Sequence, residues 1–349
     1  MRDEPTNDGI NRRNLLGALG ALGVAGLAGC TGNGNGNGNG NGNGNGNGNG
    51  NGNGNGNGNG NGDTEVIRWH AGGTGGTYFP LSGEFETVVE NNTDYAMEVS
   101  ATGASVENVG SLANGDADFA LIQNDIAYFA KNGTGIDAFD GNPIDNLQGV
   151  ATLYPETIHI VLRPGAGIES IADMEGMRIN TGDLGSGTQV NALQILESAA
   201  GLTTDDFEEQ NTDFTQASNQ IQDGDIDAAF VVGGWPVGAI EELATTADME
   251  LLSLSDEERQ TIKDAASWFA DDTVPAGTYE GIDEAVDTVS VQAMIATRAE
   301  YDAEIVENVT AAIFDNLDDL TIKTDFISVD SAQDGMSIEL HEGAAAYFG

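Results

Sequence analysis

The stretch NGDADFAL at residues 114–121 recurs in altered form as DGDIDAAF at residues 223–230. In both copies a helical pattern ends at a Gly-Asp turn, and an apolar run typical of a buried strand follows. Upstream of each copy, a strand pattern leads into a glycine-rich loop that opens a helix. These loops are HAGGTGGTYFP at residues 70–80 and GSGT at residues 185–188. The sequence therefore predicts two copies of one α/β unit.

Alternating strands and helices predict parallel sheets with helices on both faces. Two such units side by side form two lobes, and their glycine loops lie at the carboxyl ends of strands, where open α/β sheets bind ligands. A strand pattern enters the second lobe after Pro155, and residues 286–298 carry the chain back, so that two crossings form a hinge. The alternative is a single large sheet.

The first thirty residues predict an export signal. Arg12 and Arg13 precede a short apolar run that ends at Cys30, the only cysteine of the chain. The run is too short to span a membrane, and the sequence LAGC resembles a lipobox, in which the signal is cut before a cysteine that is then lipidated. We predict a twin-arginine lipoprotein signal at residues 1–29 and a lipid anchor on Cys30 at the outer face of the cell membrane. A buried N-terminal helix is the alternative.

Residues 30–62 are predicted to be a flexible linker. Asn-Gly is repeated without interruption from residue 33 to residue 62, so the segment has no apolar side chain to bury and maximal backbone entropy. Thirty such residues have an end-to-end distance of roughly 30 Å. The linker would therefore hold a folded body just clear of a membrane surface.

The charge of the chain is extreme, with 11 Lys+Arg against 57 Asp+Glu and a formal net charge of −46. Nucleic acid binding is excluded, because no basic face can form. Scattered acidic residues suit molar salt, in which the Debye length is about 3 Å. We interpret the protein as that of a salt-loving archaeon; a cation-binding surface is the alternative.

The two glycine loops predict a site for an anion and not for a nucleotide. No lysine stands where a phosphate-binding loop needs one, and Tyr78 occupies the third glycine position of a dinucleotide fingerprint. Free backbone N–H groups at a helix start favour an anion. Thr74, Thr77, Ser186 and Thr188 add hydroxyl donors. Plain helix caps are the alternative.

Catalytic signatures are lacking in the sequence. His70, His159 and His341 lie far apart, and no metal-ligand spacing or nucleophile elbow occurs. His159 alternates with isoleucines in an apolar strand, so we expect it to be structural. Trp235, before Pro236 at the end of a strand, is either a pocket wall or a core anchor. We predict no enzymatic activity, no cofactor and no metal.

Across most of residues 66–348 the chain resembles the TAXI-type extracytoplasmic receptors that serve TRAP transporters. The resemblance is carried by six stretches: GGTGGTYFPLSG, ATGASVENVGSLANGDADFALIQNDIAYFA, ATLYPETIHIV, IESIADMEGMRINTGDLGSGTQVNALQIL, DGDIDAAFVVGGWP and VPAGTYEGIDEAVDTVSV. The chain departs from the family pattern at Arg68, Trp69 and His70, just before the first loop, and in its asparagine-glycine tether.

The resemblance implies a two-lobed type II periplasmic-binding-protein-like α/β fold, with lobe I at 64–155 plus 288–349 and lobe II at 156–287. It implies capture of a small carboxylate, such as glutamate or glutamine, for an ion-gradient-driven TRAP importer. Alternatives are a subunit of an ATP-driven importer, a sensor receptor, an enzyme on a two-lobed scaffold, or a surface structural protein. The ligand-binding candidates are Gly73, Thr74, Gly76, Thr77, Tyr78, Gln123, Tyr154, Ser186, Gly187, Thr188 and Trp235. Arg163, on the strand that enters lobe II, is either an additional clamp or a surface ion pair.

Overall fold

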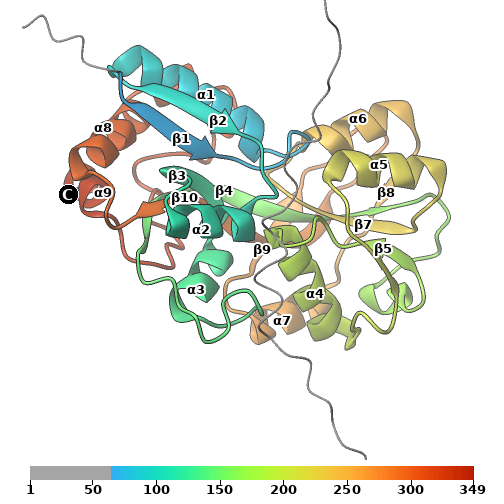
Figure 1. Ribbon diagram of the computed structural model, residues 1–349. Helices are drawn as coiled ribbons and strands as arrows, with labels where there is room; N and C mark the ends of the chain where they lie inside the picture. Colours follow the sequence, from blue (N-terminus) through green and yellow to red (C-terminus); the bar gives the residue numbers. More distant parts are fainter. Residues whose placement is uncertain (1–63) are drawn as a thin grey trace, which may run out of the picture. The chain divides into compact units, whose positions relative to one another are not determined.

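The computed structural model describes residues 64–349 (Figure 1). The predicted export signal, Cys30 and the tether lie outside the described residues. The strands are β1 (Val66–His70), β2 (Ala96–Ser100), β3 (Phe119–Gln123), β4 (Leu147–Leu162), β5 (Arg178–Asn180), β6 (Glu208–Gln210), β7 (Ala228–Val232), β8 (Glu250–Leu251), β9 (Ala270–Val274) and β10 (Val286–Arg298). The α-helices are α1 (Tyr78–Asn92), α2 (Ser105–Asn114), α3 (Asn124–Asn132), α4 (Gly187–Ala200), α5 (Phe214–Asp223), α6 (Gly238–Thr246), α7 (Asp256–Ala265), α8 (Ala303–Phe314) and α9 (Glu342–Phe348).

The strands follow the order β2-β1-β3-β10-β4-β7-β5-β6, with β9 paired to β10 and β8 to β4. Strands β2, β1 and β3 are parallel, and so are β6, β5 and β7. We call these two sets of three strands, with the helices that cover them, the first half and the second half. Each half contains one copy of the predicted repeat, and the antiparallel strands β4 and β10 lie between them.

The long strands β4 and β10 belong to both halves. Strand β4 pairs with β10 as far as Thr157 and with β7 from Ile158 onward. Strand β10 begins beside β9 and ends beside β3. The two crossings therefore occur in the segments in which the sequence predicts them. Hydrogen bonding is continuous through β10 and β4, as the single-sheet alternative expected, but the halves have separate cores.

Alternating side chains of the buried strands fill a core on each face of the sheet. In β3, Phe119 and Leu121 pack with α1, α8 and α9, whereas Ala120 and Ile122 pack with α2 and α3. In β7, alternate residues likewise pack either with α4 and α7 or with α5 and α6. Figure 1 shows α8 beside α1, and α9, at the end of the chain, beside α8. The C-terminal helices therefore pack against elements of the first half and against β4.

The Gly-Asp turns end their helices as the sequence predicts. Gly115 caps α2 with φ 75° and Gly224 caps α5 with φ 76°, a left-handed conformation that glycine adopts without strain. Each turn returns the chain to the sheet at the start of a fully buried strand, β3 or β7. In both copies of the repeat, a helix therefore ends at a left-handed glycine and a buried strand follows it.

Candidate ligand-binding site

A cavity of about 890 Å³ lies where the carboxyl ends of β1, β3 and β7 meet the loop before α4. Both halves contribute to its wall, and so does β4. Its lining residues are Gly72, Gly73, Thr74, Gly75, Gly76, Thr77, Tyr78, Ala101, Thr102, Gly103, Ala104, Ser105, Glu107, Gln123, Glu156, Asp183, Leu184, Ser186, Gly187, Thr188, Asn211, Asp213, Phe214, Thr215, Gln216 and Val232. The two glycine loops thus face one cavity.

The first glycine loop leaves backbone donors at the start of α1. The N–H of Gly76 bonds to the carbonyl of Gly73 at 3.1 Å and closes the loop. Thr77, the N-cap of α1, donates its hydroxyl to the carbonyl of Gly234 at 3.0 Å and does not cap the helix with its side chain. Within residues 64–349, the N–H groups of Tyr78 and Phe79 have no protein acceptor. The first turn of α1 therefore leaves two backbone N–H groups unpaired within residues 64–349, and of these two residues Tyr78 lines the cavity.

The second glycine loop is held more tightly. The hydroxyl of Ser186 accepts the N–H of Gln189 at 3.1 Å and so caps α4. Ser186 and Thr188 are both buried, at 6% and 5% exposure. Gly187 lies against Gln123, since a Cβ atom at position 187 would stand 1.6 Å from Gln123 Oε1. Any larger residue there would displace the side chain of Gln123, although the backbone conformation of Gly187 is an ordinary helical one.

Three buried polar atoms of the cavity wall have no hydrogen-bond partner in the protein. They are the hydroxyl of Tyr78, Oε1 of Gln123 and Oε1 of Glu156. Their residues are 6%, 2% and 3% exposed, respectively. Unpartnered polar atoms at such depth are rare and costly. They leave three polar groups of the wall available to a polar ligand.

Three ionisable groups of the wall have pKa values shifted toward their neutral forms. Burial raises the pKa of Glu156 to about 8. Burial also raises the pKa of Tyr78 well above its usual value. At Asp183, burial and then the neighbouring carboxylate of Asp213 raise the pKa. Desolvation is the leading cause in all three cases, as expected for acids in a concave, partly dry site.

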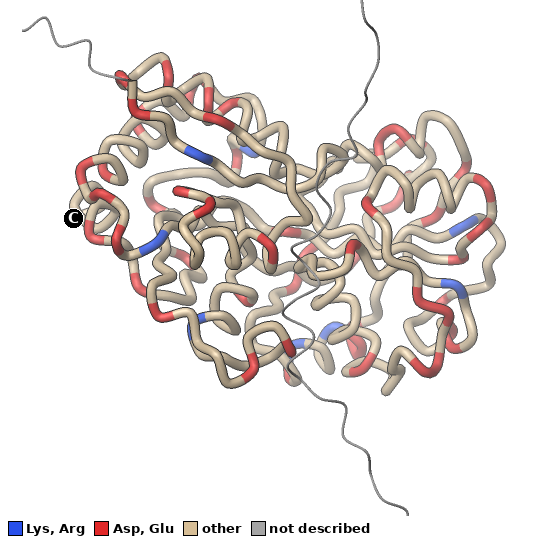
Figure 2. Tube along the Cα trace, in the orientation of Figure 1, with Lys and Arg blue, Asp and Glu red and all other residues tan. Residues whose placement is uncertain are grey.

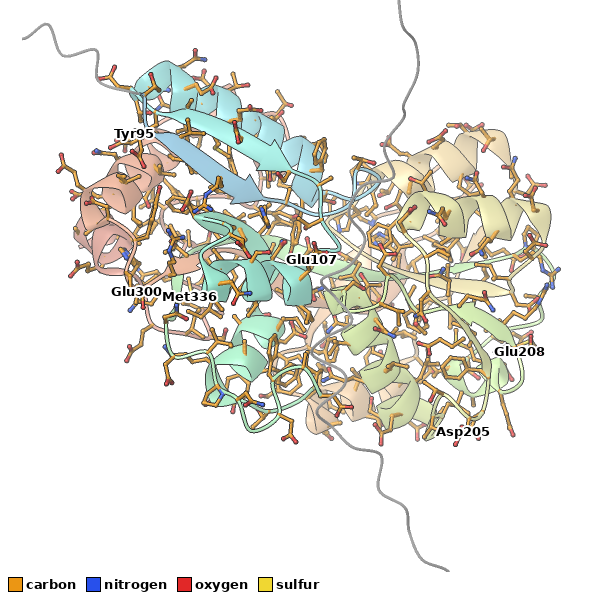
Figure 3. The ribbon with its side chains drawn as sticks, in the orientation of Figure 1. Tyr95, Glu107, Asp205, Glu208, Glu300 and Met336 are labelled. Carbon is orange, nitrogen blue, oxygen red and sulfur yellow. The ribbon has the colours of Figure 1, made fainter. Side chains whose placement is uncertain are left out.

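The charged side chains of the cavity are all acidic. Glu107, in the first turn of α2 (labelled in Figure 3), lines it together with Glu156, Asp183 and Asp213. Among the lining residues there is no Lys, Arg or His. An anionic group of a ligand would therefore depend on backbone N–H groups and hydroxyls.

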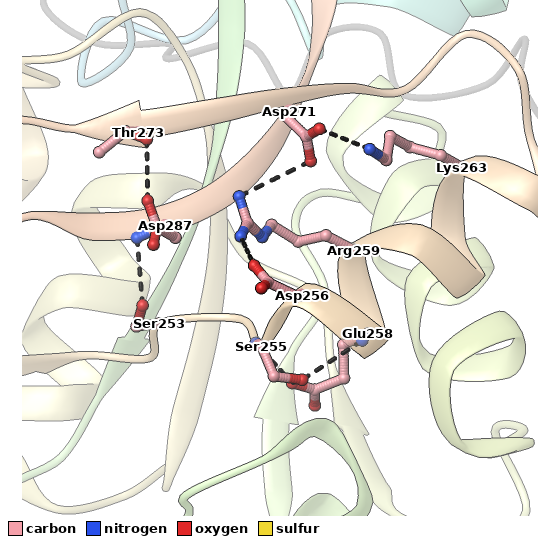
Figure 4. A network of polar contacts seen from close by, with 9 residues as sticks. All are labelled: Ser253, Ser255, Asp256, Glu258, Arg259, Lys263, Asp271, Thr273 and Asp287. Carbon is pink, nitrogen blue, oxygen red and sulfur yellow. Dashed lines mark hydrogen bonds and ion pairs between the residues drawn. The ribbon is translucent and has the colours of Figure 1, made fainter.

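The basic side chains of residues 64–349 have acceptors outside the cavity, and Figure 2 marks the positions of these residues along the chain. Arg259 and Lys263 of α7 bind Asp256 and Asp271 in a surface network (Figure 4). Lys131 donates to the carbonyl of Asp145 at 2.6 Å. Every other Lys and Arg of residues 64–349 also has an acceptor in the protein: Arg68 and Arg298 at Asp118, Arg163 and Arg178 at Asp227, and Lys323 at the carbonyl of Trp235.

Nine of the twelve predicted ligand-binding residues line this cavity: Gly73, Thr74, Gly76, Thr77, Tyr78, Gln123, Ser186, Gly187 and Thr188. The structure does not bring Tyr154, Trp235 or Arg163 to it. Tyr154 is completely buried and does not line the cavity. Trp235 packs edge-on against Phe326, with ring centroids 5.7 Å apart. Arg163 binds Asp227 at 2.7 Å, so the ion-pair alternative describes its geometry.

The three residues just before the first loop at which the chain departs from the pattern of TAXI-type receptors lie outside the cavity. The indole of Trp69 stacks on Phe119 in the core and donates to the hydroxyl of Ser82 at 2.9 Å. Arg68 binds Asp118, as noted above, and neither Arg68, Trp69 nor His70 lines the cavity. These three residues therefore support the strand and do not contact the space that a ligand would occupy.

His159 is structural, as its strand pattern predicts. Its Nε2 lies 3.0 Å from the hydroxyl of Tyr279, and its Nδ1 lies 3.1 Å from the carbonyl of Thr157. Burial lowers its pKa to about 4. In residues 64–349 no group of His, Cys, Asp and Glu is arranged to hold a metal ion. No helix in this part of the chain has the length and apolar character needed to cross a membrane.

Sequence reasoning missed the acidic part of the wall and the turns at residues 101–105 and 211–216. Acidic residues are so frequent in this chain that a single one gives no signal. Glu156 could have been found, because it is the only charged residue in the apolar stretch 151–162. The two turns hold equivalent places in the repeat, directly before α2 and α5, and that equivalence was the signal available for them.

Several solved structures share this architecture. A protein of Bordetella bronchiseptica RB50 has 13% sequence identity and a TM-score of 0.50, covering 81% of this chain and 82% of that chain. The ligand-binding component of an ABC-type import system from Staphylococcus aureus, with zinc bound, has 13% identity and a TM-score of 0.45, covering 81% and 84%. The alkanesulfonate-binding protein of Xanthomonas axonopodis pv. citri, bound to MOPS, has 12% identity and a TM-score of 0.45, covering 82% and 84%.

Two parallel α/β halves joined by two crossing strands are the architecture that the sequence predicts, and the Bordetella protein shares this fold. A family model described as the NMT1-like family matches residues 70–349. The chain belongs to the NMT1-like family, and the match begins at the first glycine loop and includes the whole cavity.

Proposed function

We propose that this protein is a solute-binding protein that captures a small molecule in the cavity between its two glycine loops. The observation that carries the proposal is the set of three buried, unpartnered polar atoms on Tyr78, Gln123 and Glu156. Membership of the NMT1-like family and the binding-protein fold support it. The protein acts by binding without chemical conversion.

The ligand of this proposal is a small carboxylate. The donors available to it are the first N–H groups of α1 and α4 and the hydroxyls of Thr74, Ser186 and Thr188. A helix start carries roughly half a positive charge, which suits a carboxylate. The acidic residues of the rim oppose an anion at long range, but molar salt screens exposed charges beyond about 3 Å.

The predicted lobes, 64–155 plus 288–349 and 156–287, would close over the ligand about β4 and β10. Their boundary at residue 155 lies close to the point in β4 at which pairing changes from β10 to β7, after Thr157. Closure by hinge motion is the usual behaviour of lobed receptors. In this proposal, the crossing segments near Tyr154–Thr157 and Val286–Val291 absorb the motion.

The protein would deliver its ligand to a membrane importer, held outside the cell by lipid on Cys30. The sequence resemblance favours the membrane subunits of a TRAP transporter. The alternatives are an ATP-driven importer or a sensor. Some proteins of similar fold are named as parts of ABC importers, which agrees with the alternative of an ATP-driven importer. Their similarity concerns the fold, so it does not identify the membrane partner of this protein.

Small molecules released from gently purified full-length protein, identified by mass spectrometry, test the proposal. A small carboxylate that rebinds in calorimetry and stays chemically unchanged is the expected result. Chemical conversion of that molecule by the protein would support the alternative that the protein is an enzyme. Co-purification of membrane subunits, identified as carrying or lacking an ATP-hydrolysing component, decides between the two importers.

A further inference from the structure

A separate cavity of about 560 Å³ lies beside strand β10 and shares no lining residue with the cavity between the glycine loops. We call it the β10 cavity. Its wall combines α3 of the first half, the segment between α7 and β9 of the second half, and residues 334–337 before α9. Residues 290–292 of β10 and Pro155 of β4 complete it. Its volume lies within the range of small-molecule sites.

Asp125, on α3, supplies the β10 cavity with an acceptor that has no partner. The residue is completely buried and lines this cavity. Its Oδ2 accepts a hydrogen bond from Nδ2 of Asn191 at 2.7 Å, whereas its Oδ1 has no hydrogen-bond partner within residues 64–349. Burial raises the pKa of Asp125 to about 6, so the carboxylate is mostly ionised at neutral pH. A buried, ionised oxygen without a partner is costly, and a donor bound in the cavity would remove that cost.

Gln292, on β10, supplies a second acceptor. Its Oε1 is buried and also lacks a partner in the described part of the chain. The backbone N–H of Gln292 donates to Oδ1 of Asn124 at 3.0 Å, so the residue lies beside the start of α3. Gln292 and Asp125 line the same cavity. Both therefore favour an occupant that carries hydrogen-bond donors.

The charge of the wall is entirely negative. The acidic lining residues are Asp125, Asp271, Asp272 and Asp334, and no lining residue is a Lys, Arg or His. Asp271 is already bound by two basic side chains of α7 (Figure 4). The other three aspartates form no ion pair within residues 64–349. The cavity therefore favours a cation.

Two aromatic rings, one from each half, provide the apolar part of the wall. Tyr128 of α3 and Trp268, just after α7, lie with their ring centroids 6.1 Å apart. Both line the cavity, and Tyr128 is 43% exposed. Aromatic faces attract a cation within about 6 Å of the ring centroid and also pack against alkyl groups.

The chemistry of the wall selects among cations. In residues 64–349 no group of three His, Cys, Asp or Glu side chains is arranged to hold a metal ion. A quaternary ammonium group would suit the aromatic rings, but it has no N–H for the oxygen of Asp125. A primary ammonium group brings a positive charge and three donors together. It therefore satisfies the carboxylate, the amide oxygen and the rings at once.

We propose that the β10 cavity is a second binding site, for a small molecule that carries a primary ammonium group. The ammonium group donates to Oδ1 of Asp125 and Oε1 of Gln292, and the alkyl part of the molecule packs on Tyr128 and Trp268. The inference does not rest on the proposed function, because the two cavities share no lining residue. An occupant would contact both halves beside the strands that connect them.

The test compares two probes that differ only in their N–H groups. n-Butylammonium and n-butyltrimethylammonium have the same alkyl chain and the same charge, but only the first can donate a hydrogen bond. Calorimetry on the full-length protein in molar salt is expected to show that n-butylammonium binds at least about tenfold more tightly. Equal affinities for the two probes, or no saturable binding of n-butylammonium, would overturn the inference.

Two variants test the acceptors separately. Asp125→Asn removes the charge, and we expect the affinity for n-butylammonium to fall at least about tenfold. Gln292→Met keeps the length of the side chain but removes its oxygen, and a loss of at least about threefold is expected. The matched control is Asp264→Asn, which removes an exposed carboxylate of α7 that is bonded to Gln260 and does not line the cavity. It is expected to bind n-butylammonium like the wild type.

Melting curves of the variants monitor folding. If Asp125→Asn does not fold, Gln292→Met decides the result. Unchanged affinity in a folded Asp125→Asn variant, or in Gln292→Met, contradicts the proposed contacts.

A crystal structure of the protein with n-butylammonium gives the position of the probe. Its nitrogen is expected within hydrogen-bond distance of Oδ1 of Asp125. A probe found only in the cavity between the glycine loops, or only at carboxylates of the exposed surface, would show that the β10 cavity is not an ammonium site.

Discussion

Asp118 and Asp227 hold the same place in the two halves, and each binds the arginine of the neighbouring strand in the same way. Arg68 donates to Asp118 from Nε at 3.0 Å, from Nη2 at 2.7 Å and from its backbone N–H at 2.9 Å. The corresponding distances from Arg178 to Asp227 are 3.0, 2.8 and 3.1 Å. In return, the backbone N–H of each aspartate donates to the carbonyl of the same arginine.

A second arginine completes each site from a long strand or its continuation. Arg298, at the end of β10, donates to Asp118 at 2.9 Å, and Arg163, just after β4, donates to Asp227 at 2.7 Å. Two positive charges on one largely buried carboxylate lower the pKa of both aspartates. The equivalence shows that the repeat extends to its ion pairs and not only to its secondary structure.

We expect Asp118→Asn and Asp227→Asn each to lower the free energy of unfolding by ~1–2 kcal/mol, a range that allows for the partial exposure of the arginines. The two losses should add in the double variant, because the sites share no residues. Since the pKa values of both aspartates are lowered in the fold, this stabilisation is present above their unfolded pKa and is lost as pH falls below it. Chemical denaturation at several pH values measures it; a loss that stays constant into strong acid would contradict the ion-pair origin.

Much of the fold follows from the repeat alone. The turns at Gly115 and Gly224 and the buried strands after them are local features, and the sequence predicts their positions closely. What it does not predict is how a side chain is used once the halves are assembled. Arg163 was a candidate clamp because it follows the crossing strand, but a partner 64 residues later, Asp227, holds it at the surface.

The sequence predicts the parts of the candidate site that backbone N–H groups form. It does not predict the parts that depend on which side chains become buried in the folded protein. The glycine loops carry their own signal, since their spacing and position in the repeat place them at one edge of the sheet. The only sequence signal of Glu156 is that it is the one charged residue of the apolar stretch 151–162, and its burial in the folded protein is what places it in the site. Trp235 was a candidate pocket wall because it is a large aromatic residue at the end of a strand. It packs on Phe326 and does not line the cavity.

Glu156→Gln should stabilise the ligand-free protein at alkaline pH. Burial raises the pKa of Glu156 to about 8, so below its unfolded pKa the residue is neutral in both states and costs nothing. As pH rises toward 8 the folded state must hold a proton or bury a charge, and stability falls by about 1.4 kcal/mol per unit of pKa difference. Above pH 8 we therefore expect Glu156→Gln to be more stable by a few kcal/mol, with the advantage shrinking toward pH 5.

The control for this experiment is Glu98→Gln, which removes an exposed carboxylate from β2. It is expected to change the stability by less than about 0.5 kcal/mol. Thermal melting across the pH range provides the comparison. Equal melting curves for Glu156→Gln and wild type above pH 8 would mean that burial does not raise the pKa of Glu156.

Gly187→Ala should disturb the cavity, although alanine is the better helix former. The new Cβ would stand 1.6 Å from Gln123 Oε1 and 3.0 Å from the hydroxyl of Ser105, so Gln123 must leave its place. We expect ligand affinity to fall at least about tenfold, because the acceptor that Gln123 presents is lost. Gly110→Ala in α2, where a Cβ meets open space, is the matched control and should stabilise by ~1 kcal/mol. Equal binding by Gly187→Ala and wild type would rule out the contact between Gln123 and a ligand.

Cys30→Ala tests the anchor. Without the thiol no lipid can be attached, so folded protein should either be released to the medium or remain uncleaved in the membrane. Fractionation of cells and medium, with mass spectrometry of the N-terminus, separates these outcomes. A variant that is processed and retained like the wild type would show that lipid on Cys30 is not the anchor.

The hydroxyls of the second loop should bind the ligand's carboxylate, but their removal has different consequences for folding. Ser186 also caps α4 through the N–H of Gln189, so Ser186→Ala should cost ~1 kcal/mol of stability in addition to affinity. Within residues 64–349 the hydroxyl of Thr188 does not cap α4 as Ser186 does, so Thr188→Val should leave stability nearly unchanged. Charge-assisted hydrogen bonds are worth roughly 1.5–3 kcal/mol each, and even partial replacement by water leaves the double variant weaker by ~2 kcal/mol, about 30-fold in affinity. Calorimetric titration with the co-purified ligand measures the affinity, and melting curves without ligand measure the stability. A double variant that binds as tightly as wild type, or a wild type that prefers a neutral sugar or an organic cation to every carboxylate tested, would exclude carboxylate binding at this loop.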